Sequence, residues 1–237
     1  MIERAKSFIK SAFPGGGPLW RRLRGFRQTN IPEPNLEKTF TEIYLKNSWA
    51  DPESVSGRGS TLARTEAIRQ ALPDLLASVG AQSLIDAACG DLNWMRHTDL
   101  RGVEYLGVDI VADLIAANQL RHSRTGRRFV VLDITRDCLP KADVILCRDT
   151  FIHLSFRDAG AALANFKQSG AALLLATTHF NVRENTDVQS GGWRSVNLEL
   201  PPYSFPEPLQ LLVEDPQLGK GLGLWRLGDL KGQYRER

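Results

Sequence analysis

The chain has 237 residues, long enough for one sizeable domain with a full core, and its hydrophobic content of 42% is ordinary for a globular protein. It has no apolar run long enough to span a membrane, and charges interrupt the apolar positions near its start too often for a signal peptide, so we expect a cytoplasmic protein. Its three cysteines, Cys89, Cys138 and Cys147, are odd in number and lack CxxC spacing. This argues against a disulfide framework and a structural zinc site.

The net charge of +3 is unevenly distributed. Residues 1–30 contain seven Lys or Arg and one Glu, which gives +6, and subtracting this from +3 leaves −3 for the remainder. Apolar residues at helical spacing around Lys6 and Lys10 predict a short amphipathic helix over 2–13, which the Pro- and Gly-rich stretch 14–18 ends. We expect residues 1–35 to form a basic, partly flexible extension and residues 36–237 to form the domain. The extension either stays solvated or makes weak contact with an anionic membrane surface or a protein.

Two further helices are expected before the first strand. Helical spacing predicts an amphipathic helix over 36–49, followed by a loop over 51–61. Ser60 or Thr61 can cap the next helix, which runs to Val79 with a kink at Pro73.

Beyond residue 82, short apolar runs alternate with segments of helical period. Helices are expected over 112–123 and 156–168. The apolar runs predict strands over 83–89, 105–110, 129–134, 142–149, 172–178, 209–215 and 221–227. Only a short turn separates the last two, which suits an antiparallel hairpin at one edge. The pattern predicts an α/β fold with a doubly wound, mostly parallel seven-stranded sheet that ends in this hairpin.

Acidic residues fall at the ends of the first three strands, where an open α/β sheet binds its ligand. They are Asp86, Asp109 and Asp133. Asp109 follows Asp86 by 23 residues, about the spacing that lets a carboxylate accept hydrogen bonds from both hydroxyls of a ribose. A dinucleotide would also require G-x-G-x-x-G after the first strand, whereas the stretch DAACGDLNW at 86–94 contains only Gly90. Each aspartate alone has the alternative of a helix cap or a turn residue.

With five strands and a terminal hairpin, the chain resembles the class I S-adenosylmethionine-dependent methyltransferases. SLIDAACGDLNWM corresponds to the first motif of that family, YLGVDI to its acidic ribose-binding motif, and FVVLDI to the motif whose aspartate contacts the adenine amine. The resemblance implies S-adenosylmethionine as the cofactor, whose loop requires one close backbone approach but no phosphate cradle. The sequence departs from the family at Ala88 and Leu92, where glycines are frequent.

The resemblance assigns residues to each part of the cofactor. Near the methionine portion lie Asp86, Cys89, Gly90 and Asp91; at the ribose, Asp109 and Ile110; at the adenine, Asp133 and Ile134. From their positions in the sequence we also expect Asn93 and Trp94 to cover the cofactor, and Arg148, at the end of the fourth strand, to face the same crevice. A narrower resemblance, to a bacterial group within class I, extends over about residues 44–215 and implies that 56–61 form a lid over the methionine portion.

The stretch ADVILCRDTFIHLSF at 142–156 resembles the fourth motif of the family in its small-molecule enzymes. It lacks the Asn/Asp-Pro-Pro-aromatic sequence of DNA and RNA amino-methylases, and the acidic balance of the domain also argues against a nucleic acid acceptor. Methyl transfer requires alignment and, for a hydroxyl acceptor, removal of a proton. His153 and His179 are the candidate bases, with Asp149 a third candidate or an orienting partner. No local spacing requires a metal, and we expect none.

Residues 179–208 form a long connection, and such segments are usually functional. Its polar and aromatic side chains predict a polar organic acceptor such as a sugar, although Trp193, Tyr203 and Phe205 can instead pack the connection on the core. The sequence therefore predicts a methyltransferase that acts at oxygen on a small-molecule or glycan-type acceptor. The alternatives are a methyltransferase-like binding or scaffold subunit without turnover and a nicotinamide-dependent oxidoreductase.

Overall fold

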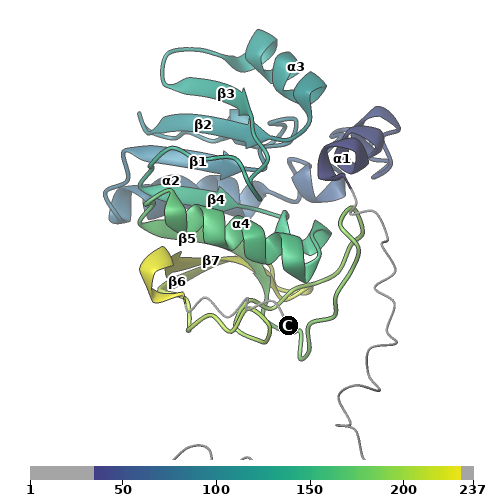
Figure 1. Ribbon diagram of the computed structural model, residues 1–237. Coiled ribbons are helices and arrows are strands. Elements are labelled where there is room, and N and C mark those ends of the chain that lie inside the picture. Colours follow the sequence, from purple (N-terminus) through teal and green to yellow (C-terminus); the bar gives the residue numbers. More distant parts are fainter. Residues whose placement is uncertain (1–34, 231–237) are drawn as a thin grey trace, which may run out of the picture. The chain divides into compact units, whose positions relative to one another are not determined.

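The computed structural model describes residues 35–230 (Figure 1). The helix expected over 2–13 lies outside them, and the division of the chain into an extension and a domain remains a prediction.

One mixed sheet of seven strands forms the centre of the fold, in the order β3-β2-β1-β4-β5-β7-β6. The neighbours from β3 to β5 are parallel, whereas β7 is antiparallel to both β5 and β6. The strands are β1 (Ser83–Ala87), β2 (Glu104–Asp109), β3 (Arg127–Val131), β4 (Val144–Cys147), β5 (Leu173–His179), β6 (Gln210–Asp215) and β7 (Lys220–Arg226). This confirms the predicted sheet and its terminal hairpin, and it places the reversal of strand order between β1 and β4.

Within residues 35–230, four α-helices accompany the sheet, at the places where the sequence pattern predicts helices. They are α1 (Leu36–Leu45), α2 (Glu66–Ser78), α3 (Ala112–His122) and α4 (Phe156–Gln168). Helix α1 ends earlier than expected because the backbone turns into the left-handed region at Asn47, with φ of 43°. The expected cap of α2 at Ser60 or Thr61 is wrong: Thr65 precedes the helix, and its hydroxyl donates to the Thr61 carbonyl across a turn. Helix α2 continues through Pro73 to Ser78.

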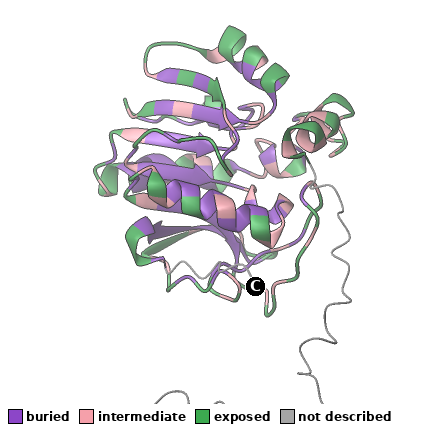
Figure 2. Cartoon of the chain, in the orientation of Figure 1, coloured by how far each residue is buried: buried purple, intermediate pink, exposed green. Residues whose placement is uncertain are grey.

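Both faces of the sheet are covered because successive strand residues point to opposite sides. In β1, Leu84 belongs to a cluster with Leu72 of α2, whereas Ile85 belongs to a cluster with Ala162 and Phe166 of α4. Figure 1 shows α2 and α4 on opposite sides of the strands, and Figure 2 shows the strands between them largely buried. The two apolar layers fix the carboxyl ends of β1, β2 and β4 at one edge.

The long connection between β5 and β6 covers part of the α4 face. Val196, Leu198, Tyr203 and Phe205 are all buried in the same cluster as α4. The packing alternative therefore describes Tyr203 and Phe205, whereas Trp193 is 64% exposed.

The contact of α4 with the sheet is testable through Phe166, which is fully buried. Phe166→Ala is expected to lower the free energy of unfolding by about 3–5 kcal/mol, because a large aromatic side chain leaves a cavity in a packed core. Leu120→Ala on α3, where Leu120 is 87% exposed, is the matched control and should change it by about 0.5 kcal/mol or less. Urea denaturation measures both. Equal effects would contradict the packing of α4.

Candidate functional site

A pocket of about 1060 Å³, its mouth included, opens where the carboxyl ends of β1, β2 and β4 meet. Residues of α1 and of the segment 49–60 form the opposite wall. The structure brings most of the predicted site residues together here: Asp86, Cys89, Gly90, Trp94, Asp109, Ile110, Asp133, Ile134, Arg148, Asp149 and His153. It does not bring in Asp91, Asn93 or His179.

Asp109 fixes the loop that follows β1. Its Oδ2 accepts the N–H of Gly90 at 3.1 Å, and its Oδ1 accepts the N–H of Val111 at 3.1 Å. Burial raises the pKa of this carboxyl, and the two backbone N–H groups partly offset that effect. Asp109 forms no ion pair with any residue of 35–230, so a cationic or hydroxyl-bearing ligand would find an acceptor there.

Asp86 lies buried beside Asp109 in the same pocket. The Tyr105 hydroxyl donates to its Oδ2 at 2.7 Å. Burial raises the pKa of Asp86 to about 7, although the hydrogen bond from Tyr105 acts in the opposite direction. Near neutral pH this carboxyl is therefore partly protonated, and a bound cation would favour its ionised form.

Asp133 combines a pocket position with a turn. Its Oδ1 accepts the N–H of Thr135 at 2.9 Å and the hydroxyl of the same residue at 2.6 Å. Its Oδ2 pairs with Arg136 Nε at 2.9 Å. Asp133 is therefore a turn residue, as its position after a strand allows, and it also lines the pocket.

The two predicted cofactor residues outside the pocket hold its lid in place. The carboxylate of Asp91 accepts the Ser54 hydroxyl at 2.8 Å, the Val55 N–H at 3.0 Å and the Ser56 hydroxyl at 3.1 Å. The amide of Asn93 donates to the Ser60 carbonyl at 3.0 Å. Ser56 and Ser60 line the pocket, and Asp91 and Asn93 thus tether the segment 56–61, the predicted lid, to the loop after β1.

Gly90 is required by the protein itself. Its φ is +56°, and a Cβ at this position would overlap Ser56 Oγ. The close approach predicted for the loop is therefore made by Ser56, whose hydroxyl also accepts the N–H of Asp91 at 3.0 Å. Leu92 adopts the left-handed conformation with φ of 60° and buries its side chain, which accounts for a leucine at a position where the family often has glycine.

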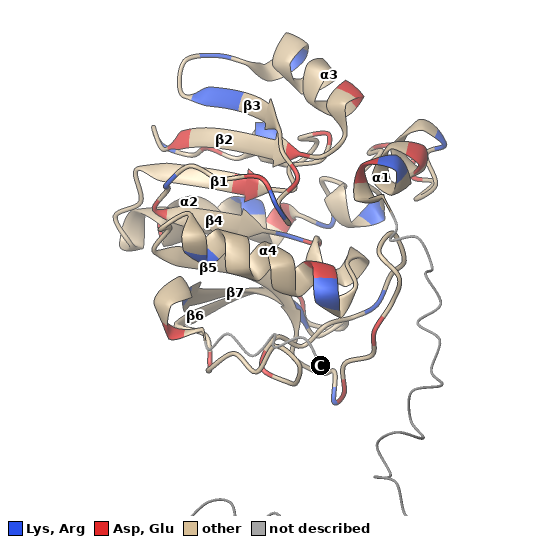
Figure 3. Cartoon of the chain, viewed as in Figure 1, with Lys and Arg blue, Asp and Glu red and all other residues tan. Residues whose placement is uncertain are grey.

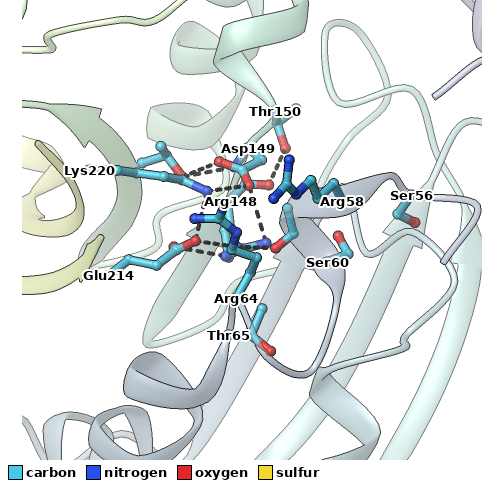
Figure 4. A network of polar contacts seen from close by, with 12 residues as sticks. Ser56, Arg58, Ser60, Arg64, Thr65, Arg148, Asp149, Thr150, Glu214 and Lys220 are labelled. Carbon is cyan, nitrogen blue, oxygen red and sulfur yellow. Dashed lines mark hydrogen bonds and ion pairs between the residues drawn. The ribbon is translucent and has the colours of Figure 1, made fainter. Parts of the chain in front are cut away.

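A buried network of two cations and two anions underlies the pocket (Figure 4). Arg148 pairs with Glu214 and lies 3.2 Å from Asp149, while Lys220 lies 2.7 Å from both carboxylates. Arg148 also donates to the Gly59 carbonyl at 2.6 Å, so the network reaches the lid. Its guanidinium lies 5.3 Å from the ring centroid of Trp94. The charge of Arg148 is thus satisfied within the protein.

The network determines the charge of Asp149. Burial by itself would raise its pKa, but the positive charges of Arg148 and Lys220 outweigh burial and hold the pKa below its usual range. Asp149 therefore stays ionised at neutral pH, which fits an orienting partner better than a base.

His153 has the form of a general base. Its Nδ1 lies 2.7 Å from the Gly192 carbonyl, which can only accept, so Nδ1 carries the proton and Nε2 keeps its lone pair. The imidazole packs against Trp49, with ring centroids 4.8 Å apart. Burial lowers the pKa of His153, against the raising effects of the Gly192 carbonyl and Asp149. The ring is therefore neutral at neutral pH.

His179 lies apart from the pocket. It is 4% exposed at the end of β5, where its Nδ1 lies 3.3 Å from both the N–H and the carbonyl of Val196. Burial lowers its pKa, so the neutral ring serves the packing of the β5 end.

Several polar side chains of the 180–209 connection form hydrogen bonds within the protein. Asn185 donates to the backbone carbonyls of Asn197 and Pro201, and Asp187 accepts the N–H of Phe156 at 2.7 Å. Arg194 donates to the Leu154 carbonyl at 2.6 Å. No residue of 180–209 lines the pocket, and the connection reaches it through the Gly192 carbonyl on His153. The polar composition that predicted a sugar acceptor thus has a structural use.

Several residues that line the pocket were not predicted from the sequence. Thr150 joins two strand ends, because its hydroxyl accepts the Ala88 N–H and donates to the Ala87 carbonyl, both at 3.1 Å. Trp49 and the apolar side of α1 form the outer wall. The helical period of 36–49 was visible in the sequence, but it did not indicate that the apolar side faces a cavity.

Neither a family model nor a curated protein matches the chain. Among solved structures, 1,6-didemethyltoxoflavin-N1-methyltransferase of Burkholderia thailandensis, with bound 1,6-didemethyltoxoflavin and S-adenosylhomocysteine, is 18% identical with a TM-score of 0.54. The match covers 81% of this chain and 86% of that one. The methyltransferase domain of bacterial CtHen1 is 15% identical with a TM-score of 0.51, over 68% of this chain and 98% of that one.

Human N-acetylserotonin methyltransferase in complex with S-adenosylmethionine is 14% identical with a TM-score of 0.50, over 81% of this chain and 65% of that one. At these identities the likeness shows the fold. The chain has the fold of the class I S-adenosylmethionine-dependent methyltransferases, as the sequence predicts.

Two further properties concern residues 35–230 alone. None of their helices is long and apolar enough to cross a bilayer. Within the same range, no three His, Cys, Asp or Glu side chains gather in an arrangement that could hold a metal ion.

The effect of the contact between Gly90 and Ser56 on stability can be measured separately from the effect of backbone strain. Gly90→Ala should lower the melting temperature more than Gly102→Ala, because both glycines have positive φ but only Gly90 has an atom within 4 Å of the added Cβ. Strain alone is worth about 1–2 kcal/mol, and Gly90→Ala adds the displacement of Ser56. Differential scanning calorimetry measures both variants. Equal losses would show that Ser56 moves aside freely.

Proposed function

We propose that the chain is a methyltransferase that binds S-adenosylmethionine and moves its methyl group to a small-molecule acceptor. One observation carries this proposal: the pocket holds two buried carboxylates, Asp86 and Asp109, that pair with no cation of the described residues, whereas the charge of Arg148 is already compensated. Figure 3 marks these acidic strand ends in red. Such a wall suits a sulfonium and an ammonium group and disfavours a diphosphate.

The same pocket disfavours a nicotinamide dinucleotide on geometric grounds. A pyrophosphate requires the N-terminus of an α-helix after the first strand. Here β1 is followed by the 3₁₀-helix η3 (Met95–His97) and then by β2. The oxidoreductase alternative therefore lacks its anion site.

The residues present fit the cofactor in the positions that the resemblance implies. Asp109 would accept the ribose hydroxyls, Asp133 and Ile134 would border the adenine, and Asp86 with the Gly90 loop would hold the methionine portion. Ser56 and Ser60 would close the pocket from the lid. When bound, the cofactor supplies an electrophilic methyl group. The solved methyltransferases with S-adenosylmethionine or S-adenosylhomocysteine bound support this assignment through the shared fold.

His153 would take the proton that a hydroxyl acceptor loses. Its Nε2 is unprotonated, its ring is held by Gly192 and Trp49, and the ionised Asp149 would stabilise the imidazolium that forms. A base of this kind supports transfer to oxygen, since a hydroxyl must lose its proton as it is methylated. A scaffold subunit without turnover would not require the unprotonated Nε2 of His153 beside an ionised Asp149.

Cofactor binding tests the first part of the proposal. S-adenosylhomocysteine should raise the melting temperature and NADH should not, and Asp109→Ala should abolish the shift because the ribose loses its acceptor. Asp113→Ala, which removes an exposed carboxylate at the start of α3, is the matched control and should retain the full shift. A shift of unchanged size in Asp109→Ala would remove Asp109 from the site.

The base assignment predicts a pH dependence. In the wild type, kcat/KM for a hydroxyl acceptor should fall as the pH drops through the pKa of His153, which burial places below the usual 6.5 of histidine. His153→Asn can still donate to the Gly192 carbonyl but offers no base, so it should lower kcat by about 10²–10⁴-fold and flatten this part of the profile.

Exposed His97 provides the control, since His97→Asn should keep the wild-type profile. Release of S-adenosylhomocysteine measures turnover at each pH. A wild-type profile in His153→Asn would assign the base elsewhere.

A further inference from the structure

We propose that the acceptor is a flat, predominantly apolar molecule, such as a hydroxylated aromatic compound, and not a sugar. This inference rests on the proposed methyltransferase function, and it follows from the part of the pocket around His153.

One side of His153 is apolar and aromatic, whereas the charge of Asp149 acts on it from another side. Trp49 stacks on the imidazole, and Leu154 follows it in the chain; both line the pocket. Ile43 of α1 belongs to the same wall, because Gly191 links it to His153. The Gly191 N–H donates to the His153 carbonyl at 2.8 Å, and the Ile43 Cδ1 atom lies 3.4 Å from the position that a Cβ on Gly191 would take. A molecule whose hydroxyl points at His153 Nε2 would therefore contact this apolar wall.

The two polar side chains of the pocket that precede His153 at the end of β4, Asp149 and Thr150, are already engaged within the protein. The Thr150 hydroxyl bonds to the backbone of Ala87 and Ala88, and Asp149 is held by Arg148, Lys220 and Thr177. The polar side chains of 180–209 do not reach the pocket. A sugar would bury several hydroxyls there without partners, which is unfavourable, whereas an aromatic ring would lose nothing.

Helix α1 supplies independent support. Its apolar side is formed by Leu36, Phe40, Ile43 and Tyr44, at the i, i+4, i+7 and i+8 positions of one helical face. All four line the pocket, and α1 has no buried residue (Figure 2). An apolar helical side is normally buried against another element. Here an apolar ligand would complete its burial, and the face of Trp49 offers an aromatic stacking partner.

Calorimetric titration of the protein saturated with S-adenosylhomocysteine tests the inference. The probes are 2-naphthol, a flat aromatic with one hydroxyl, and methyl β-D-glucopyranoside, a polyhydroxylated molecule of similar size. We expect 2-naphthol to bind about tenfold or more tightly than the glucoside. Ile43→Ser should weaken 2-naphthol binding by about tenfold, since it removes one buried aliphatic contact.

Leu45→Ser is the matched control, because Leu45 lies on the same helix, is 65% exposed and does not line the pocket. It should leave the affinity unchanged. The preference of the wild type needs no variant, so a poorly folded Ile43→Ser protein does not weaken the test.

The outcomes separate the two proposals. If S-adenosylhomocysteine fails to bind the wild type, the proposed function is wrong. If it binds but 2-naphthol does not, or the glucoside binds as well as 2-naphthol, the acceptor class is wrong while the cofactor assignment stands. Equal losses in Ile43→Ser and Leu45→Ser would also overturn the proposed acceptor wall.

Discussion

The site depends on the buried network of Arg148, Asp149, Glu214 and Lys220. It joins the end of β4 to the β6-β7 hairpin, and through Arg148 and Gly59 it also anchors the lid. Because its two positive and two negative charges balance, each is tolerated in a buried position, whereas removing one partner from such a cluster typically costs about 3–5 kcal/mol. The network therefore holds three separate segments at fixed distances around the pocket.

The electrostatics of the pocket follow from this balance. Arg148 forms its ion pairs with Glu214 and Asp149, and neither Asp86 nor Asp109 forms an ion pair with a cation of the described residues, although the charge of Arg148 acts on Asp86 from a distance. Their carboxyls respond with raised pKa values, as isolated buried acids do. A cationic ligand would supply positive charge and would favour the ionised form of both acids. The same network keeps Asp149 ionised next to the neutral His153.

The fold was largely predictable from the sequence because the helical spacing of the helices and the short apolar runs of the strands are both clear. Apolar runs located all seven strands, and the acidic strand ends located the pocket. The contacts of Asp91 and Asn93 were not predictable, since a residue next to a glycine loop can face either a ligand or another segment of the chain. Their partners, Ser54 and Ser60, lie more than thirty residues away in the sequence. Only tertiary structure brings that segment to the loop.

The polar residues of 180–209 show why composition alone is a weak guide to the acceptor. A long connection without helix or strand has backbone groups that no regular ladder satisfies, and buried groups of this kind need partners. Asn185 and Arg194 meet that need by donating to backbone carbonyls. Side-chain groups that form these hydrogen bonds within the protein do not bind a substrate at the same time. The connection holds His153 through the Gly192 carbonyl, and the pocket wall near it, which we propose contacts the acceptor, is made by the apolar side of α1 and by Trp49.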